Sequence, residues 1–104
     1  PRPTAIFAAN NFIAIGVLKT LREMDIRVPE ALSVVAFDDL PLGLVIDPFL
    51  TVAAQPAYEM GQRATELLLA SLKREAAEAR PTEVLLPVPL IVRGSTSAPP
   101  VCQM

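Results

Sequence analysis

Histidine is absent from the 104 residues, and Cys102 is the single cysteine. Histidine is the side chain that most often exchanges protons at neutral pH and binds metals, so neither a histidine-based triad nor a zinc cluster can be built here. A lone cysteine cannot form an internal disulfide, which agrees with a cytoplasmic protein. We therefore expect no enzyme, no metal site and no cofactor.

Long apolar runs and clusters of positive charge are also missing. No run reaches the roughly 18 apolar residues of a membrane span, and no signal peptide is visible. The nine Lys and Arg residues are scattered and the net charge is −2, whereas nucleic-acid binders gather basic residues on one face. We expect neither membrane contact nor direct DNA contact from these residues. The chain opens at Pro1 rather than at a methionine, so we expect a missing N-terminal part.

Hydrophobic residues occur in short runs along the chain. Hydrophobic residues make up 52% of the chain, which predicts a packed core. Residues 4–8 and 33–37 are typical of buried strands, and residues 12–24 between them have apolar positions at helical spacing. This order predicts an α/β fold with a right-handed parallel β-α-β unit. We further expect a strand at 50–54, a helix from Gln55 to about Arg80, and strands at 83–86 and 90–93 that are separated by Pro87-Val88-Pro89.

Small polar residues follow the first two predicted strands. Asn10 and Asn11 come after the first strand, and Asp38 and Asp39 come directly after the second. Ligands of parallel sheets bind beyond the carboxyl ends of the strands, so the two corners should form one ligand site. Either asparagine could instead cap the helix that follows; we favour Asn10 for the ligand and Asn11 for the cap.

The two aspartates also have alternative roles. Asp38 could accept hydrogen bonds from two neighbouring sugar hydroxyls, or it could cap a short helix predicted from Pro41. Asp39 suits that cap, or a supporting role behind the ligand contacts, better than direct contact. Adjacent carboxylates at a strand end point in different directions, so we do not expect them to form a catalytic pair. Phe12 and Phe37 are expected in the core rather than against a sugar face.

Three stretches resemble, in order, the end of the regulator domain of LacI-family (lactose-repressor-like) transcription regulators. They are TAIFAANNFIAIGVLKTLREMDIRVPEALSVVAFDDLPL, PFLTVAAQPAYEMGQRATELLLASL and VLLPVPLIVRGST. The resemblance implies a periplasmic-binding-protein-like fold of type I, with a ligand cleft between two α/β lobes. Only the C-terminal portion, residues 1–97, would be present. Residues 3–54 and 88–93 would belong to the C-terminal lobe, residues 56–86 to the N-terminal lobe, and residues 98–104 to a disordered tail.

The resemblance also implies roles for single residues. Asn10 and Asp38 match ligand-binding residues of the family, and Gln55 matches a glutamine at the hinge near the cleft. Asn11 and Asp39 would support or cap. The family's dimer interface corresponds to Ile15, Leu42, Leu44, Val45 and Ile46.

The chain departs from the family pattern at several positions. Asn11 replaces a usual Asp, Ala36 a usual Gly and Gly94 a frequent Glu. Asp25 stands where Gly usually follows the helix, and a left-handed turn there would cost about 1 kcal/mol. From Gly94 onward we expect the chain to be mobile.

The function implied is the effector-sensing part of a cytoplasmic, sugar-responsive regulator. The protein would be a homodimer whose small-molecule effector, a sugar, alters the binding of operator DNA by a missing N-terminal headpiece. One alternative is a periplasmic sugar-binding protein of a transport system. Another is a doubly wound enzyme, which the lack of a phosphate loop and of a nucleophile elbow disfavours. Unpaired strand edges predict that these residues alone self-associate.

Overall fold

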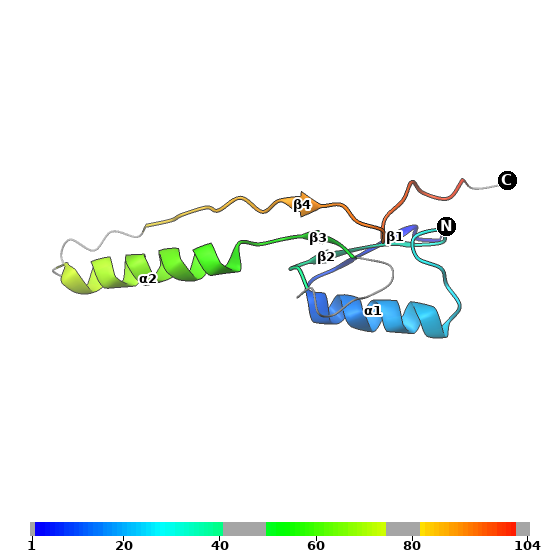
Figure 1. The fold of residues 1–104 in the computed structure, drawn as a ribbon, viewed down its shortest axis with the longest axis horizontal. Coiled ribbons are helices and arrows are strands. Elements are labelled where there is room, and N and C mark those ends of the chain that lie inside the picture. The colour runs from blue at the N-terminus through cyan, green and yellow to red at the C-terminus, as the bar shows by residue number, and fades with distance from the viewer. Residues whose placement is uncertain (1, 41–49, 75–81, 102–104) are drawn as a thin grey trace. The chain divides into compact units, whose positions relative to one another are not determined.

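A computed structural model describes residues 2–40, 50–74 and 82–101. The elements in these residues are β1 (Ala5–Ala8), α1 (Asn11–Glu23), β2 (Ser33–Phe37), β3 (Thr51–Ala53), α2 (Ala57–Lys73) and β4 (Leu90–Ile91), as Figure 1 shows. They fall into two compact units, Pro1–Gln55 with Pro89–Met104, and Pro56–Val88. The assignment of these residues to two lobes of a larger domain stays a prediction.

The first unit contains a sheet with the strand order β1-β2-β3-β4. β1 and β2 are parallel, with Ala8 opposite Ala36, and α1 connects them. β3 continues the sheet in parallel, and β4 adds an antiparallel strand beside it. The predicted parallel β-α-β unit is therefore confirmed. β4 follows Pro87-Val88-Pro89 and lies at the edge of the described sheet, where prolines are tolerated.

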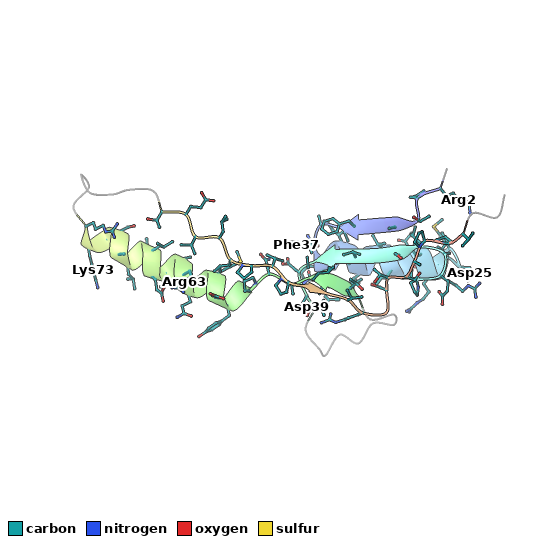
Figure 2. The ribbon with its side chains drawn as sticks, turned by 90° about the horizontal axis from the view of Figure 1, so that it is seen from above. Arg2, Asp25, Phe37, Asp39, Arg63 and Lys73 are labelled. Atoms are coloured by element: carbon teal, nitrogen blue, oxygen red, sulfur yellow. The ribbon has the colours of Figure 1, made fainter. Side chains whose placement is uncertain are left out.

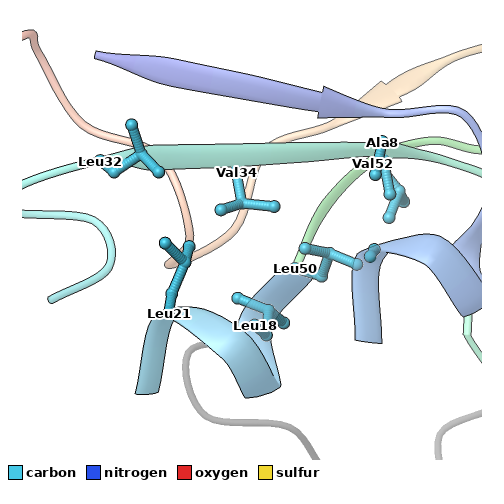
Figure 3. Close-up of a cluster of buried hydrophobic side chains, with 9 residues drawn as sticks. Ala8, Leu18, Leu21, Leu32, Val34, Leu50 and Val52 are labelled. Atoms are coloured by element: carbon cyan, nitrogen blue, oxygen red, sulfur yellow. The ribbon is translucent and has the colours of Figure 1, made fainter. Parts of the chain in front are cut away.

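The core lies between α1 and one face of the sheet (Figure 3). Ala14, Leu18 and Leu21 share one face of α1 because three to four residues make one helical turn. They pack against side chains that alternate along the strands, such as Val34 and Ala36 of β2. The buried hydrophobic residues are Ala8, Ala14, Leu18, Leu21, Leu32, Val34, Ala36, Leu50 and Val52.

Two apolar residues of the segment 12–24, which was predicted to be helical, lie outside this core, contrary to expectation. Met24, expected on the buried stripe, is 62% exposed, and Phe12, expected in the core, is 78% exposed. Met24 lies one residue past the end of α1, so it leaves the helical register. Phe12 lies in the first turn, on a face that the described residues do not cover.

The turn after α1 takes the conformation expected from its aspartate. Asp25 has φ 55°, in the left-handed region. The amide of Ile26 donates to the carbonyl of Leu21 at 2.9 Å, as in a Schellman motif, and Ile26 packs against the core. A residue with a Cβ atom in this position costs about 1 kcal/mol relative to glycine.

The second unit contains α2. The helix ends at Lys73, where Arg74 turns to an extended conformation, rather than at about Arg80, and residues 75–81 lie outside the described part. Within Ala57–Lys73 no side chain is buried, and Tyr58 and Leu72 are 89% and 73% exposed. Residues 83–86 are not a strand, because no other strand among the described residues lies beside them. In the described ranges, no helix has both the length and the apolar character that crossing a membrane requires.

Candidate functional site

The two polar corners lie at the same edge of the sheet. Asn10 and Asp38 each follow the paired residues Ala8 and Ala36 by two positions, and β1 and β2 run in the same direction. The side-chain Nδ2 of Asn11 donates to the backbone carbonyl of Asp39 at 3.0 Å, so the corners are in direct contact. Figure 2 shows Phe37 and Asp39 at one end of this unit and Asp25 at the other.

Asn10 caps α1. Its Oδ1 accepts a hydrogen bond from the amide of Ile13 at 2.8 Å, and its backbone is extended. The prediction that Asn11 caps the helix is therefore wrong. Asn11 is the first helical residue, so the cap falls on the residue before it. The cap uses only the amide oxygen of Asn10, and its Nδ2 group keeps its donor capacity for a ligand, a role that stays a prediction.

Asp38 adopts an unusual backbone conformation at the end of β2. Its φ is 73°, in the left-handed region, and its amide donates to the carbonyl of Ala53 at 2.9 Å. The Nε2 of Gln55 donates to Oδ1 of the Asp38 carboxylate, although the two residues are 17 positions apart. The structure thus brings two of the three expected ligand-binding residues into contact, on the edge that carries Asn10.

Asp39 forms an ion pair with Arg93, a partner that the sequence analysis did not identify. Arg93 donates from Nη1 to Oδ1 at 2.7 Å and from Nη2 to Oδ2 at 2.8 Å, and the amide of Leu40 also donates to Oδ1. The hydrogen bonds from Arg93 hold the pKa of Asp39 below its ordinary value, against the opposing effect of burial. The same pair raises the pKa of Arg93. Residues 41–49, where a short helix capped by Asp39 was predicted, lie outside the described residues.

Ser95 fixes the segment that follows Arg93. Its hydroxyl donates to the carbonyl of Val34 at 2.6 Å and accepts from the amide of Thr51 at 2.7 Å, and the residue is fully buried. The Ser95 side chain thus satisfies a backbone carbonyl of β2 and the first backbone amide of β3. The amide of Ser97 donates to Ser33 Oγ at 3.1 Å. The expected mobility from Gly94 onward is therefore wrong for Ser95 and Ser97, because hydrogen bonds attach both to the sheet.

The residues expected at a dimer interface are only partly described. Ile15 is half-buried on α1. Leu42, Leu44, Val45 and Ile46 lie outside the described residues. The interface stays a prediction.

Comparison with known proteins identifies the family. The sequence profile of the periplasmic binding protein-like domain matches residues 1–96, so the chain belongs to this family. It is 46% identical over 96 residues to a probable opine utilization operon repressor of Rhizobium rhizogenes, covering 92% of the chain and 48% of that protein. It is 39% identical over 98 residues to the transcriptional repressor CytR of Escherichia coli, covering 94% of the chain and 28% of that protein.

Solved structures of LacI-family regulators have the same fold. A regulator from Enterococcus faecium with bound ribose gives a TM-score of 0.78 at 35% identity, over 90% of this chain and 34% of that one. A regulator from Arthrobacter sp. FB24 in complex with lactose gives 0.72 at 35% identity, over 90% and 35%. Other neighbours hold sucrose or cellobiose. The homologues are thus LacI-family repressors, and the chain spans half their length or less.

Proposed function

We propose that the chain is the effector-sensing part of a LacI-type transcription regulator. A sugar would bind at the corner formed by Asn10, Asp38 and Gln55, in a cleft completed by a second lobe. The contact between the corners after β1 and β2 carries the proposal, because it gathers polar groups where parallel sheets bind ligands. The names of the relatives support repression, and the sugars in the neighbouring structures support the ligand class.

The chemistry of the corner suits a neutral polyol. Sugar hydroxyls both donate and accept hydrogen bonds, and the corner offers the carboxylate oxygens of Asp38 together with the donor Nδ2 of Asn10. The partner of Asp38, Gln55, is neutral, so the carboxylate keeps a negative charge that favours hydroxyl donors over anionic groups. The carboxylate of Asp39, in contrast, is paired with Arg93 and plays a supporting role.

Binding would be coupled to DNA through the arrangement of two lobes. Effector favours one arrangement only to the extent that it binds that arrangement more tightly than the other. A homodimer would transmit the change to DNA-binding headpieces that these 104 residues do not contain, and effector and operator would then affect one another reciprocally. We place the regulator in the cytoplasm, without catalytic activity. Because the relatives are repressors, a transport binding protein is not favoured.

The experiment compares two left-handed aspartates in the full-length protein that carries this chain. Affinity for ribose, lactose, sucrose and cellobiose is measured by calorimetry for the wild type, D38N and D25N. Asp25 is the control because it shares the backbone conformation but lies at the opposite end of the unit. We expect D38N to weaken binding of the preferred sugar about tenfold or more, roughly one lost charged hydrogen bond, and D25N to leave it unchanged. A wild type that binds none of the four sugars, or equal binding by D38N, contradicts the proposal.

A further inference from the structure

Arg93 contacts the residues on both sides of the segment 41–49. Besides its two hydrogen bonds to the Asp39 carboxylate, its Nη1 donates to the carbonyl of Leu50 at 3.2 Å. The side chain of Arg93 is 26% exposed and that of Asp39 is 34% exposed. The planar guanidinium is thus directed at Asp39 and Leu50, which indicates a supporting role rather than contact with a ligand.

Asp38 requires such support. A residue with a Cβ atom stays in the left-handed region only where its surroundings hold it there, and such residues gather at ligand sites. Two hydrogen bonds hold Asp38 directly. Its backbone amide donates to the carbonyl of Ala53, and its carboxylate accepts from the side chain of Gln55. After Asp38, the restraint comes through the next residue, Asp39.

Asp39 is held by three groups from different parts of the chain. Its backbone carbonyl accepts from Asn11 of α1, and its carboxylate accepts from the amide of Leu40 and from Arg93 beyond β4. Arg93 donates two of the hydrogen bonds to the Asp39 carboxylate. Among the described residues, Arg93 is also the only cation that forms an ion pair with Asp39. Removing Arg93 therefore takes away half of these hydrogen bonds that hold Asp39, together with its ion pair, on the carboxyl-terminal side of Asp38.

We infer that Arg93 is a positioning residue of the effector site, which holds the Asp38 carboxylate in place through Asp39. This inference rests on the proposed function, since it assigns Arg93 a role in the binding of the same sugar. The fork of two parallel N–H groups matters as well as the charge, because a lysine ammonium cannot bind both carboxylate oxygens in one plane.

The first test needs no ligand. The Asp38 amide is bonded to Ala53, so its hydrogen-exchange rate reports how often the corner opens. In the full-length protein we expect R93M, which keeps the apolar stem, to speed exchange at Asp38 about tenfold relative to the amides of β2, and R93K to have a smaller effect. R63M is the matched control, since Arg63 forms an ion pair with Glu66 on α2. Unchanged exchange at Asp38, or equal acceleration throughout β2, overturns the inference.

The second test uses whichever of ribose, lactose, sucrose and cellobiose the wild type binds most tightly. We expect R93M to weaken its binding about tenfold, R93K to restore part of the loss, and R63M to have no effect. In a D38N background, R93M should change affinity less than twofold, because residues that act through one another are not additive. Full additivity overturns the inference. If no sugar binds the wild type, the proposed function fails, while the exchange measurement still decides the role of Arg93.

Discussion

The side-chain amide of Asn11 donates to the backbone carbonyl of Asp39 across 28 positions of sequence, at 3.0 Å. This bond joins the beginning of α1 to the end of β2, so the two polar corners form one structure. The family pattern usually has Asp at the position of Asn11, and a carboxylate cannot donate to a carbonyl. In this chain the amide therefore has a structural role, while Asn10 caps the helix and remains available to a ligand through Nδ2.

The two roles of Asn10 can be separated by substitution. A serine hydroxyl can accept from the Ile13 amide as the asparagine oxygen does, but it does not reproduce the Nδ2 donor. We expect N10S to keep the thermal stability nearly unchanged and to weaken sugar binding severalfold. N10A should in addition destabilise the protein by about 1 kcal/mol through the lost cap. Thermal melting and calorimetry on the full-length protein check both effects, and an N10S protein with wild-type affinity would show that Asn10 is only a cap.

Sequence patterns were sufficient for elements whose partners lie within the chain. β2 has the predicted bounds because its neighbouring strands, β1 and β3, and the helix that packs against it, α1, all belong to this chain. Residues 83–86 have a similar apolar pattern but form no strand, since a strand exists only with a hydrogen-bonded neighbour. Periodicity reports which faces are apolar, and cannot report whether a partner is present.

The candidate site was predictable in its location but not in its contacts. Parallel strands end at one edge, so the meeting of the corners follows from the order of the elements. Whether Asn10 or Asn11 caps α1 depends on the residue at which the helix begins, which no periodic pattern determines. The pair of Asp39 and Arg93 spans 54 positions, and a single long-range ion pair leaves no local signal.

Ser95 tests the energetic role of the closing segment. Its hydroxyl bonds to two buried backbone groups, the carbonyl of Val34 and the amide of Thr51. S95A would leave both groups without this partner, and we expect a loss of about 2–3 kcal/mol of folding free energy. S71A is the control, because Ser71 is an exposed serine whose hydroxyl bonds only within α2 and whose loss should change stability by less than about 0.5 kcal/mol. Chemical denaturation followed by circular dichroism measures the free energy of unfolding of the two variants and of the wild type. Equal midpoints for S95A and the wild type would contradict this account.

The ion pair of Asp39 and Arg93 predicts a response to acid. The hydrogen bonds from Arg93 lower the pKa of Asp39 in the folded protein below the ordinary value of 3.8. Since the folded pKa is the lower one, the pair stabilises fully at pH values above 3.8, and this contribution is lost as the pH falls through the folded pKa. The carboxyl carbon of Asp39, followed by NMR, should titrate below 3.8 in the wild type and move upward in R93M. A titration of Asp39 that R93M does not alter would contradict the pairing.

Asp25 offers a stabilising change away from the candidate site. Its left-handed conformation closes α1, and the family pattern has glycine at this position. Glycine adopts the left-handed conformation without the steric cost that aspartate has there. Glycine is also more flexible in the unfolded chain, which offsets part of this gain. We therefore expect D25G to raise the free energy of unfolding by about 0.5–1 kcal/mol. D38G places glycine in the other left-handed aspartate position and serves as the comparison. We expect both variants to relieve backbone strain, while only D38G loses affinity for sugar, because only that side chain is proposed to contact it. A higher melting temperature for D25G with unchanged sugar affinity supports this assignment. A lower melting temperature would show that the Asp25 side chain has stabilising contacts that outweigh its strain.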